Sequence, residues 1–305
     1  MAFTAADVKN LREMTGVGMM DCKKALAASD GDIDKAIEFL REKGLAASAK
    51  KAGRIAAEGM AYAGVIDGMG VVVEVNAETD FVGKNEKFVD FVKGVAATVA
   101  ANKPADLDAL MACKYAGSDR TVTEQQQEMV LVIGENIKVR RFAFYTEGVC
   151  VPYIHAGGKI GVLVNLETSL TAEQVNECGK DVAMQIAALN PRFWDKSQVT
   201  QDVLDEEKKI MMVQMANDPK MASKPEQVRE KIVVGKLNKF YAENCLLQQE
   251  FVKDNSMSVE KYIASAAKAL GGTVTFKDAV RFEKGEGIEK KQEDFAAEIA
   301  SMVKG

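Results

Sequence analysis

A diverged internal repeat is the feature that most restricts what this chain can fold into. Residues 70–75 alternate three valines onto one face of a strand, and residues 161–166 repeat the scheme with apolar residues. A Glu-Thr pair follows each strand, and each pair leads into an amphipathic helical pattern that ends before Pro104 or Pro191. The repeat therefore predicts an α+β fold with two core subdomains, each built from a hairpin and a helix with an antiparallel sheet.

The repeat also indicates where the two copies differ. A hairpin-like partner precedes each strand, across Asp67-Gly68 in the first copy and Gly157-Gly158 in the second. When the two Glu-Thr pairs are aligned, the first copy contains the additional residues Asn76-Ala77. The copies therefore differ most in the loop that follows the first strand.

That loop carries an unusual aromatic residue. Phe81 follows the stretch Glu78-Thr79-Asp80, at a point where loops usually become polar. One interpretation is that Phe81 folds back as the first residue of the next core. The other is an exposed wedge of Phe81 and Val82 that is presented to a partner, since aromatic anchors dominate interface energetics. The residues by themselves leave both interpretations open.

The segment before the repeat predicts three short helices. Thr4 and Asp7 have the spacing of a capping signal for the first helix, a second helix covers about residues 19–28, and the apolar stripe of a third ends at Gly44. Residues 46–53 are rich in alanine, serine and lysine, which predicts a linker or a solvated helix end. The small basic patch of Lys50, Lys51 and Arg54 predicts a solvated linker or, as the minor alternative, a weak contact with RNA.

The segment after the second copy predicts an antiparallel helical hairpin over residues 198–244. Prolines at its middle mark the turn, and Pro225 suits the first position of the returning helix. The hairpin can project as an arm if its ends lie close together, and its methionines fit either packing within it or an adaptable contact surface. A helix up to Leu270, a strand over 274–282 and a final helix around Phe295 complete the chain. The predicted parts are a three-helix N-terminal module with a linker (1–54), core subdomain N (55–148), core subdomain C (149–197 and 245–284), the hairpin insertion (198–244) and a C-terminal helix module (285–305).

Composition makes most catalytic and nucleic-acid-binding classes unfavourable for this chain of 305 residues. Its formal net charge is −5, whereas a chain-wide grip on nucleic acid needs a clustered surplus of Lys and Arg. The chain has a single histidine, His155, so a metal site with two histidines cannot form. Histidine is also the commonest general base in enzymes, and it is nearly absent here. The five scattered cysteines favour a reducing cytosol, no stretch has the length of a membrane span, and no glycine run fits a phosphate-binding loop. We therefore expect a cytoplasmic protein that is not an enzyme and binds no metal, cofactor, nucleotide or membrane directly.

Several segments, in the expected order, resemble bacterial translation elongation factor Ts. Residues 11–26 resemble the N-terminal signature of that family, and residues 74–85, around Thr79-Asp80-Phe81-Val82, resemble its second signature. Further matching segments are 133–137 with Arg140-Arg141, 161–164, and 285–290 with 294–298. The resemblance covers almost the whole chain. It departs from the family pattern at Ala77, at Gly83 and in a longer segment over 114–127.

The resemblance implies a guanine-nucleotide exchange factor for elongation factor Tu. It implies that the protein binds elongation factor Tu both with GDP and without a nucleotide. It implies that the N-terminal module is similar to ubiquitin-associated domains and docks on the GTPase domain of the partner. The residues that it would recruit there are Arg12, Met19, Met20 and Lys23. Asp80 and Phe81, flanked by Thr79 and Val82, would intrude near the partner's magnesium site. The residues that would contact or support the same region are Ile133, Gly134 and His155.

Two other functions stay open from the residues alone. An interaction adaptor would use the N-terminal helices and the hairpin arm as docking surfaces without affecting a nucleotide. An enzyme would use His155 with nearby carboxylates, although a structural or interface role is the favoured interpretation for a lone histidine.

Overall fold

The computed structural model describes residues 3–289, and it has the predicted α+β class. Backbone contacts divide the chain into two compact units. Unit 1 consists of Met1–Phe144, Ile154–Gly161 and Phe282–Gly305, and unit 2 of Tyr145–Tyr153 and Val162–Arg281. The predicted final helix around Phe295 lies outside the described residues. Within residues 3–289, no helix is both long enough and apolar enough to cross a membrane.

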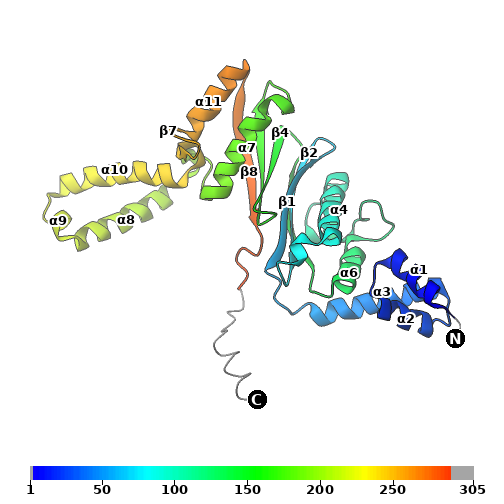
Figure 1. Ribbon diagram of the computed structural model, residues 1–305. Helices are drawn as coiled ribbons and strands as arrows, with labels where there is room; N and C mark the ends of the chain where they lie inside the picture. The colour runs from blue at the N-terminus through cyan, green and yellow to red at the C-terminus, as the bar shows by residue number, and fades with distance from the viewer. Residues whose placement is uncertain (1–2, 290–305) are drawn as a thin grey trace, which may run out of the picture. The chain divides into compact units, whose positions relative to one another are not determined.

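Unit 1 begins with three helices that enclose a small core of their own (Figure 1). They are α1 (Ala5–Thr15), α2 (Met19–Ala28) and α3 (Ile33–Lys51). The predicted capping signal is present as a full capping box between Thr4 and Asp7, and Gly16 ends α1 in the left-handed conformation. Leu11, Cys22 and Leu26 are fully buried between the helices, which fixes the module around an apolar centre.

The third helix is longer than the sequence predicts. Its predicted end at Gly44 is wrong, because α3 continues to Lys51. Gly44 is buried, and a Cβ atom there would lie 3.4 Å from the backbone oxygen of Gln127 in α6 (Val122–Ile133). The glycine therefore allows α3 and α6 to pack closely, which outweighs its poor helix propensity of about 1 kcal/mol. Residues 46–51 are a helix end, one of the two predicted interpretations.

The first copy of the repeat forms the main core of unit 1. Strands β1 (Glu58–Ile66) and β2 (Met69–Ala77) pair antiparallel, and β3 (Lys138–Tyr145) lies beside β2. The predicted turn is confirmed: Asp67 and Gly68 have φ values of 50° and 80°, the positive angles that a two-residue hairpin turn favours. Every residue of β2 is buried, so this strand is the centre of the sheet.

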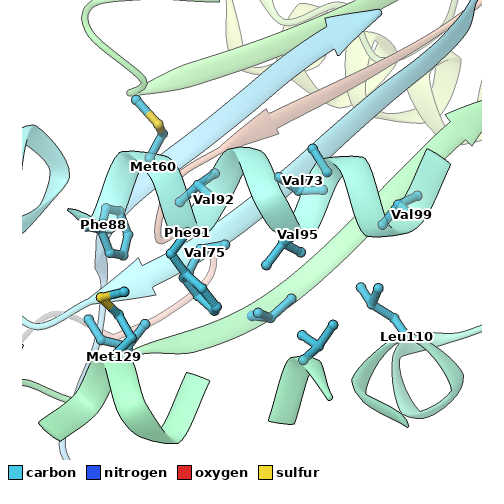
Figure 2. Packing of buried hydrophobic residues seen from close by; sticks show 14 of the residues in the cluster. Met60, Val73, Val75, Phe88, Phe91, Val92, Val95, Val99, Leu110 and Met129 are labelled. Atoms are coloured by element: carbon cyan, nitrogen blue, oxygen red, sulfur yellow. The ribbon is translucent and has the colours of Figure 1, made fainter. Parts of the chain in front are cut away.

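Helix α4 (Glu86–Asn102) packs with this sheet, and α5 (Leu107–Ala112) and α6 extend the same cluster (Figure 2). The labelled side chains from α4 and β2 are Phe88, Phe91, Val92, Val95 and Val99 with Val73 and Val75. Burying a side chain of this size contributes about 1.5–3 kcal/mol, so the cluster is the main source of stability in unit 1. The alternation of valines in β2 thus serves the packing that the sequence predicts.

The second copy repeats this architecture. The strands β4 (Val149–His155), β5 (Ile160–Thr168) and β8 (Val274–Glu283) form a sheet in the order β4-β5-β8, and α7 (Ala172–Leu189) follows β5. Helices α4 and α7 end alike: Lys103 and Asn190 have positive φ values of 49° and 43°, and the predicted proline follows each. The internal repeat is therefore confirmed in its strands, its helices and its helix ends.

The predicted helical hairpin is present in unit 2, with an additional short helix at its tip. Its helices are α8 (Gln201–Asn217), α9 (Pro219–Ala222) and α10 (Glu226–Asn244). Pro219 occupies the first position of α9, whereas Pro225 is the N-cap of α10 rather than its first helical residue, one position from the prediction. Met211 and Met215 are buried between α8 and α10, which confirms packing as the role of these two methionines.

The two ends of the hairpin lie together, as an inserted arm requires. The Phe193 N–H donates to the Asn244 carbonyl at 3.1 Å, and the Leu246 N–H donates to the Phe193 carbonyl at 2.9 Å. The remaining elements of unit 2 are the short strands β6 (Glu250–Phe251) and β7 (Asp254–Ser258) and the helix α11 (Val259–Leu270). The helix end at Leu270 is the predicted one.

Candidate functional site

The loop between β2 and α4 presents one large aromatic side chain to solvent. Phe81 is 80% exposed, whereas Val82, the next residue, is 6% exposed and packs into the core cluster of unit 1. The interpretation that Phe81 begins the next core is therefore wrong, because Val82 takes that position. The expected exposed wedge of Phe81 and Val82 is therefore confirmed for Phe81 and wrong for Val82. Phe81 projects together with its exposed neighbour Asp80.

Both ends of this loop are fixed by tight local structure. On its C-terminal side, the Asn85 side chain caps α4 by accepting hydrogen bonds from the backbone of Lys87 and Phe88 at 3.0 and 3.4 Å. The short 3₁₀ helix Val82–Lys84 passes so close to β1 that a Cβ atom at Gly83 would lie 2.7 Å from the Gly59 carbonyl oxygen. Glycine at position 83 therefore suits this close approach.

The turn after α6 holds the other side of the loop. The Glu135 carboxylate accepts hydrogen bonds from the Glu78 and Thr79 N–H groups at 3.0 and 2.9 Å and from the Thr79 hydroxyl at 2.6 Å. In return, the Glu78 carboxylate accepts a hydrogen bond from the Asn136 N–H at 2.6 Å. Gly134 directly precedes Glu135 and ends α6 in the left-handed conformation, with φ of 87°. The structure thus brings the expected site segment around Gly134 to the Asp80–Phe81 loop.

The basic residues near the end of α3 join the same network. Lys51 Nζ donates to the Gly134 carbonyl at 2.5 Å, which places a cation at the C-terminus of α6, where the helix dipole favours it. Arg54 lies 3.5 Å from the Glu78 carboxylate, and its carbonyl accepts from the Asn136 side chain at 2.8 Å. Lys51 and Arg54 therefore each contact another chain segment, although the Arg54 side chain is also half exposed to solvent, as the predicted solvated linker requires.

The N-terminal module presents a second exposed surface. Met19 and Met20 are 51% and 64% exposed at the start of α2, and Arg12 and Lys23 are exposed on the same module. Exposed apolar side chains rimmed by polar ones are typical of interaction surfaces. Cys22, by contrast, belongs to the core of the module, because burial raises the pKa of its thiol and favours the neutral form.

A buried carboxylate on β2 forms a clamp that sequence reasoning missed. Glu74 is fully buried and accepts hydrogen bonds from Arg140 at 2.9 Å, Arg141 at 2.5 Å, the Asn76 side chain at 3.0 Å and the Gly285 N–H at 2.8 Å. The clamp therefore fastens the segment that follows β8 to the centre of the first sheet. The matching segments that contain Arg140-Arg141 and Gly285 were the signal that could have revealed it.

His155 lies at the exposed end of β4, in the part of the second hairpin that belongs to unit 1. The turn that carries it contacts β1, where the Ala61 N–H donates to the Gly158 carbonyl at 2.8 Å. The supporting role expected for His155 stays a prediction. Across the described residues, no group of three or more His, Cys, Asp or Glu side chains could hold a metal ion.

Comparison with known proteins identifies the family. The family model described as Elongation factor TS matches residues 78–286, which begin within the Asp80–Phe81 loop segment. Curated proteins named Elongation factor Ts from Syntrophotalea carbinolica and Clostridium kluyveri are 49% and 48% identical, covering 100% and 99% of both chains. A relative of the same name from Magnetococcus marinus is 44% identical over 100% of both chains. The chain therefore belongs to the elongation factor Ts family of translation elongation factors.

Proposed function

We propose that this protein is a guanine-nucleotide exchange factor, which binds elongation factor Tu in its GDP-bound form and promotes GDP release during translation elongation. Membership of the elongation factor Ts family supports this partner and process. The observation that carries the proposal to the level of residues is Phe81, which is 80% exposed next to Asp80 on a loop fixed at both ends. An aromatic side chain that projects from a fixed loop is suited to act as an interface anchor, because buried aromatic anchors dominate interface energetics.

The mechanism needs displacement rather than covalent chemistry. A GTPase holds GDP partly through Mg²⁺ and partly through backbone N–H groups of its phosphate loop. An aromatic ring and a carboxylate that intrude near this site disturb both contacts, and Phe81 with Asp80 supplies these groups. Burying a phenylalanine contributes about 1.5–3 kcal/mol, and docking over other surfaces supplies the remainder that offsets the lost nucleotide contacts.

Docking of the N-terminal module delivers this wedge. In the proposed complex, Met19 and Met20 enter an apolar site on the GTPase domain, while Arg12 and Lys23 supply polar contacts at its rim. The residues proposed to contact or support the region around the wedge are Thr79, Val82, Ile133, Gly134 and His155. Because coupling between two binding sites is reciprocal, GDP must weaken the hold of this protein on elongation factor Tu by the factor by which the protein weakens GDP binding. The nucleotide-free complex is then the tightest one.

The test is release of a fluorescent GDP analogue from elongation factor Tu, measured with and without this protein. The wild-type protein should accelerate release, and Phe81→Ala should retain binding but lose most of the acceleration. Val65→Ala is a matched control, because Val65 is an exposed apolar residue, 46% exposed, on β1 and outside the N-terminal module. No acceleration by the wild-type protein would refute the exchange function, and stable binding without faster release would instead identify an adaptor.

A further inference from the structure

We propose that Glu135 is a positioning residue for nucleotide exchange, which fixes the Asp80–Phe81 loop and couples it to the N-terminal module. The inference rests on the proposed exchange function and goes further, because it assigns a role to a residue that acts through its hydrogen bonds to Glu78 and Thr79. Glu135 follows Gly134, the C-cap of α6, and contacts the chain just after the end of β2.

The Glu135 carboxylate accepts hydrogen bonds from the chain just beyond the end of β2, where the ladder of strand-to-strand bonds stops. Strand β2 ends at Ala77, so the next two backbone N–H groups, of Glu78 and Thr79, leave the ladder and need another acceptor. Glu135 accepts both of them through Oε2 and accepts the Thr79 hydroxyl through Oε1. These three bonds fix the chain immediately before Asp80, and charge-assisted bonds of this type are about twice as strong as neutral ones. The direction in which Phe81 leaves the sheet is thereby set.

A second carboxylate, that of Glu78, holds the same two segments together in the opposite direction. Glu78 Oε1 accepts the Asn136 N–H at 2.6 Å, so each of the two segments supplies a carboxylate to the backbone of the other. The Asn136 side chain is buried and donates to the Arg54 carbonyl at 2.8 Å. The loop, the turn after α6 and the chain after α3 are therefore joined, although Arg54 and Asn136 are separated by 82 positions.

Helix α6 carries this support to the N-terminal module. Its residues Leu131 and Val132, three and two positions before the C-cap Gly134, pack against the hydrophobic core of the three N-terminal helices. Lys51, the last residue of α3, donates to the Gly134 carbonyl, and Lys87 of α4 donates to the Gly16 carbonyl in the turn between α1 and α2. The module and the wedge loop thus belong to one connected framework, in which docking of the module places Phe81 without a further loss of loop entropy.

Removing the carboxylate should reduce exchange more than binding. In Glu135→Ala the N–H groups of residues 78 and 79 lose their acceptor, the loop samples other conformations, and Phe81 is presented in only a fraction of complexes. We expect the maximal rate of GDP release, at saturating protein, to fall by at least about tenfold, while half-saturation changes less. Glu135→Gln should stay close to the wild type, because its amide oxygen can accept both N–H groups and its NH₂ can donate to the Thr79 hydroxyl.

The experiment is a double-mutant cycle with Phe81→Ala in the GDP-release assay on elongation factor Tu. If Glu135 acts through the wedge, Glu135→Ala should cause less than about a twofold further loss once Phe81 is absent. The matched control is Glu124→Ala, since Glu124 lies in the first turn of α6, whereas Glu135 follows the last. The Glu124 carboxylate also accepts a threonine N–H and hydroxyl, at 2.8 and 3.1 Å. This control should leave GDP release unchanged.

A second measurement is independent of exchange activity. Amide hydrogen exchange at residues 78 and 79 of the free protein should become faster in Glu135→Ala than in the wild type and stay slow in Glu124→Ala. If Glu135→Ala does not fold, Glu135→Asp serves in both assays, because it keeps the charge but is one methylene too short to reach all three donors.

The possible results separate this inference from the proposed function. Slow release with Phe81→Ala but normal release with Glu135→Ala would refute the positioning role and leave the exchange function intact. An equal loss from Glu135→Ala in the presence and absence of Phe81 would also refute it, because the effect would then not pass through the wedge. No acceleration by the wild-type protein would refute the exchange function and this inference together.

Discussion

Replacing Glu74 by glutamine should destabilise unit 1 by about 2–4 kcal/mol. Glu74 is fully buried, and its carboxylate accepts hydrogen bonds from two arginines, one asparagine side chain and one backbone N–H. Breaking a buried ion pair by removing one partner costs about 3–5 kcal/mol, because the other charge is left uncompensated. Here the side chains of Arg140 and Arg141 are 25% and 31% exposed, so water can partly solvate them, and the estimate is correspondingly lower.

The geometry shows which of the bonds a glutamine would lose. Three donors, from Arg140, Asn76 and Gly285, meet Oε1 of Glu74, and an amide oxygen at that place can still accept from them. Oε2 accepts from Arg141 Nε, and an NH₂ group at that place would face this N–H donor with hydrogens of its own. The substitution therefore removes the hydrogen bond from Arg141 and sets two donors against each other in its place. It also removes the negative charge that holds both arginines.

Thermal and urea unfolding, combined with hydrogen exchange on peptides of β2 and β3, measures this effect in unit 1. For a unit of this size, 2–4 kcal/mol corresponds to a fall in Tm of roughly 5–15 °C. Glu42→Gln on the exposed side of α3 is the control and should stay within about 0.5 kcal/mol of the wild type. A loss below about 1 kcal/mol for Glu74→Gln would refute the reasoning that the buried charge holds the clamp together.

Two further predictions concern backbone strain and thiol chemistry. Gly59→Ala should destabilise unit 1 by about 2–4 kcal/mol in urea unfolding, because Gly59 has φ of 108° and a Cβ there would lie 2.2 Å from the Val75 carbonyl oxygen. Gly68→Ala is the control: Gly68 has φ of 80° but open space around it, so the substitution should cost only about 1 kcal/mol. Equal costs for the two substitutions would contradict the steric argument. Burial raises the pKa of the Cys178 and Cys245 thiols from 9.0 to about 11, so both should react very slowly with a thiol reagent at pH 8 in the folded protein. Because the unfolded thiols lose their protons first as the pH rises, the free energy of unfolding should fall between about pH 9 and pH 11, and replacing both cysteines by alanine should remove this contribution.

The repeat in the sequence determined the architecture because each of its signals is local. Alternating valines specify a strand with a buried face, and a positive-φ turn at Asp67-Gly68 specifies a hairpin. Pro104 and Pro191 end the helices that precede them. These preferences act through neighbours in the chain, so they can be read without knowledge of the fold. The signatures around Phe81 likewise identified the family, which full-length relatives confirm.

Contacts between distant segments had no such local signal. Gly44 resembles a helix stop in sequence, yet it lies inside α3 because Gln127 packs against it from another helix. Glu135 resembles an ordinary turn residue, although it holds the N–H groups of residues 78 and 79. In both cases the partner lies more than 50 positions away, and nothing in the spacing of residues reports which segments will meet.

The Asp80–Phe81 loop shows the division most clearly. The sequence by itself determined that an aromatic residue follows an acidic turn at the end of a strand, and left two positions open for its ring. Only the tertiary structure decided between them: Val82 fills the core, so Phe81 is left exposed. The physical reason is that burial depends on the space which the sheet, α4 and α6 leave for one side chain, and that space exists only once these distant elements have packed together.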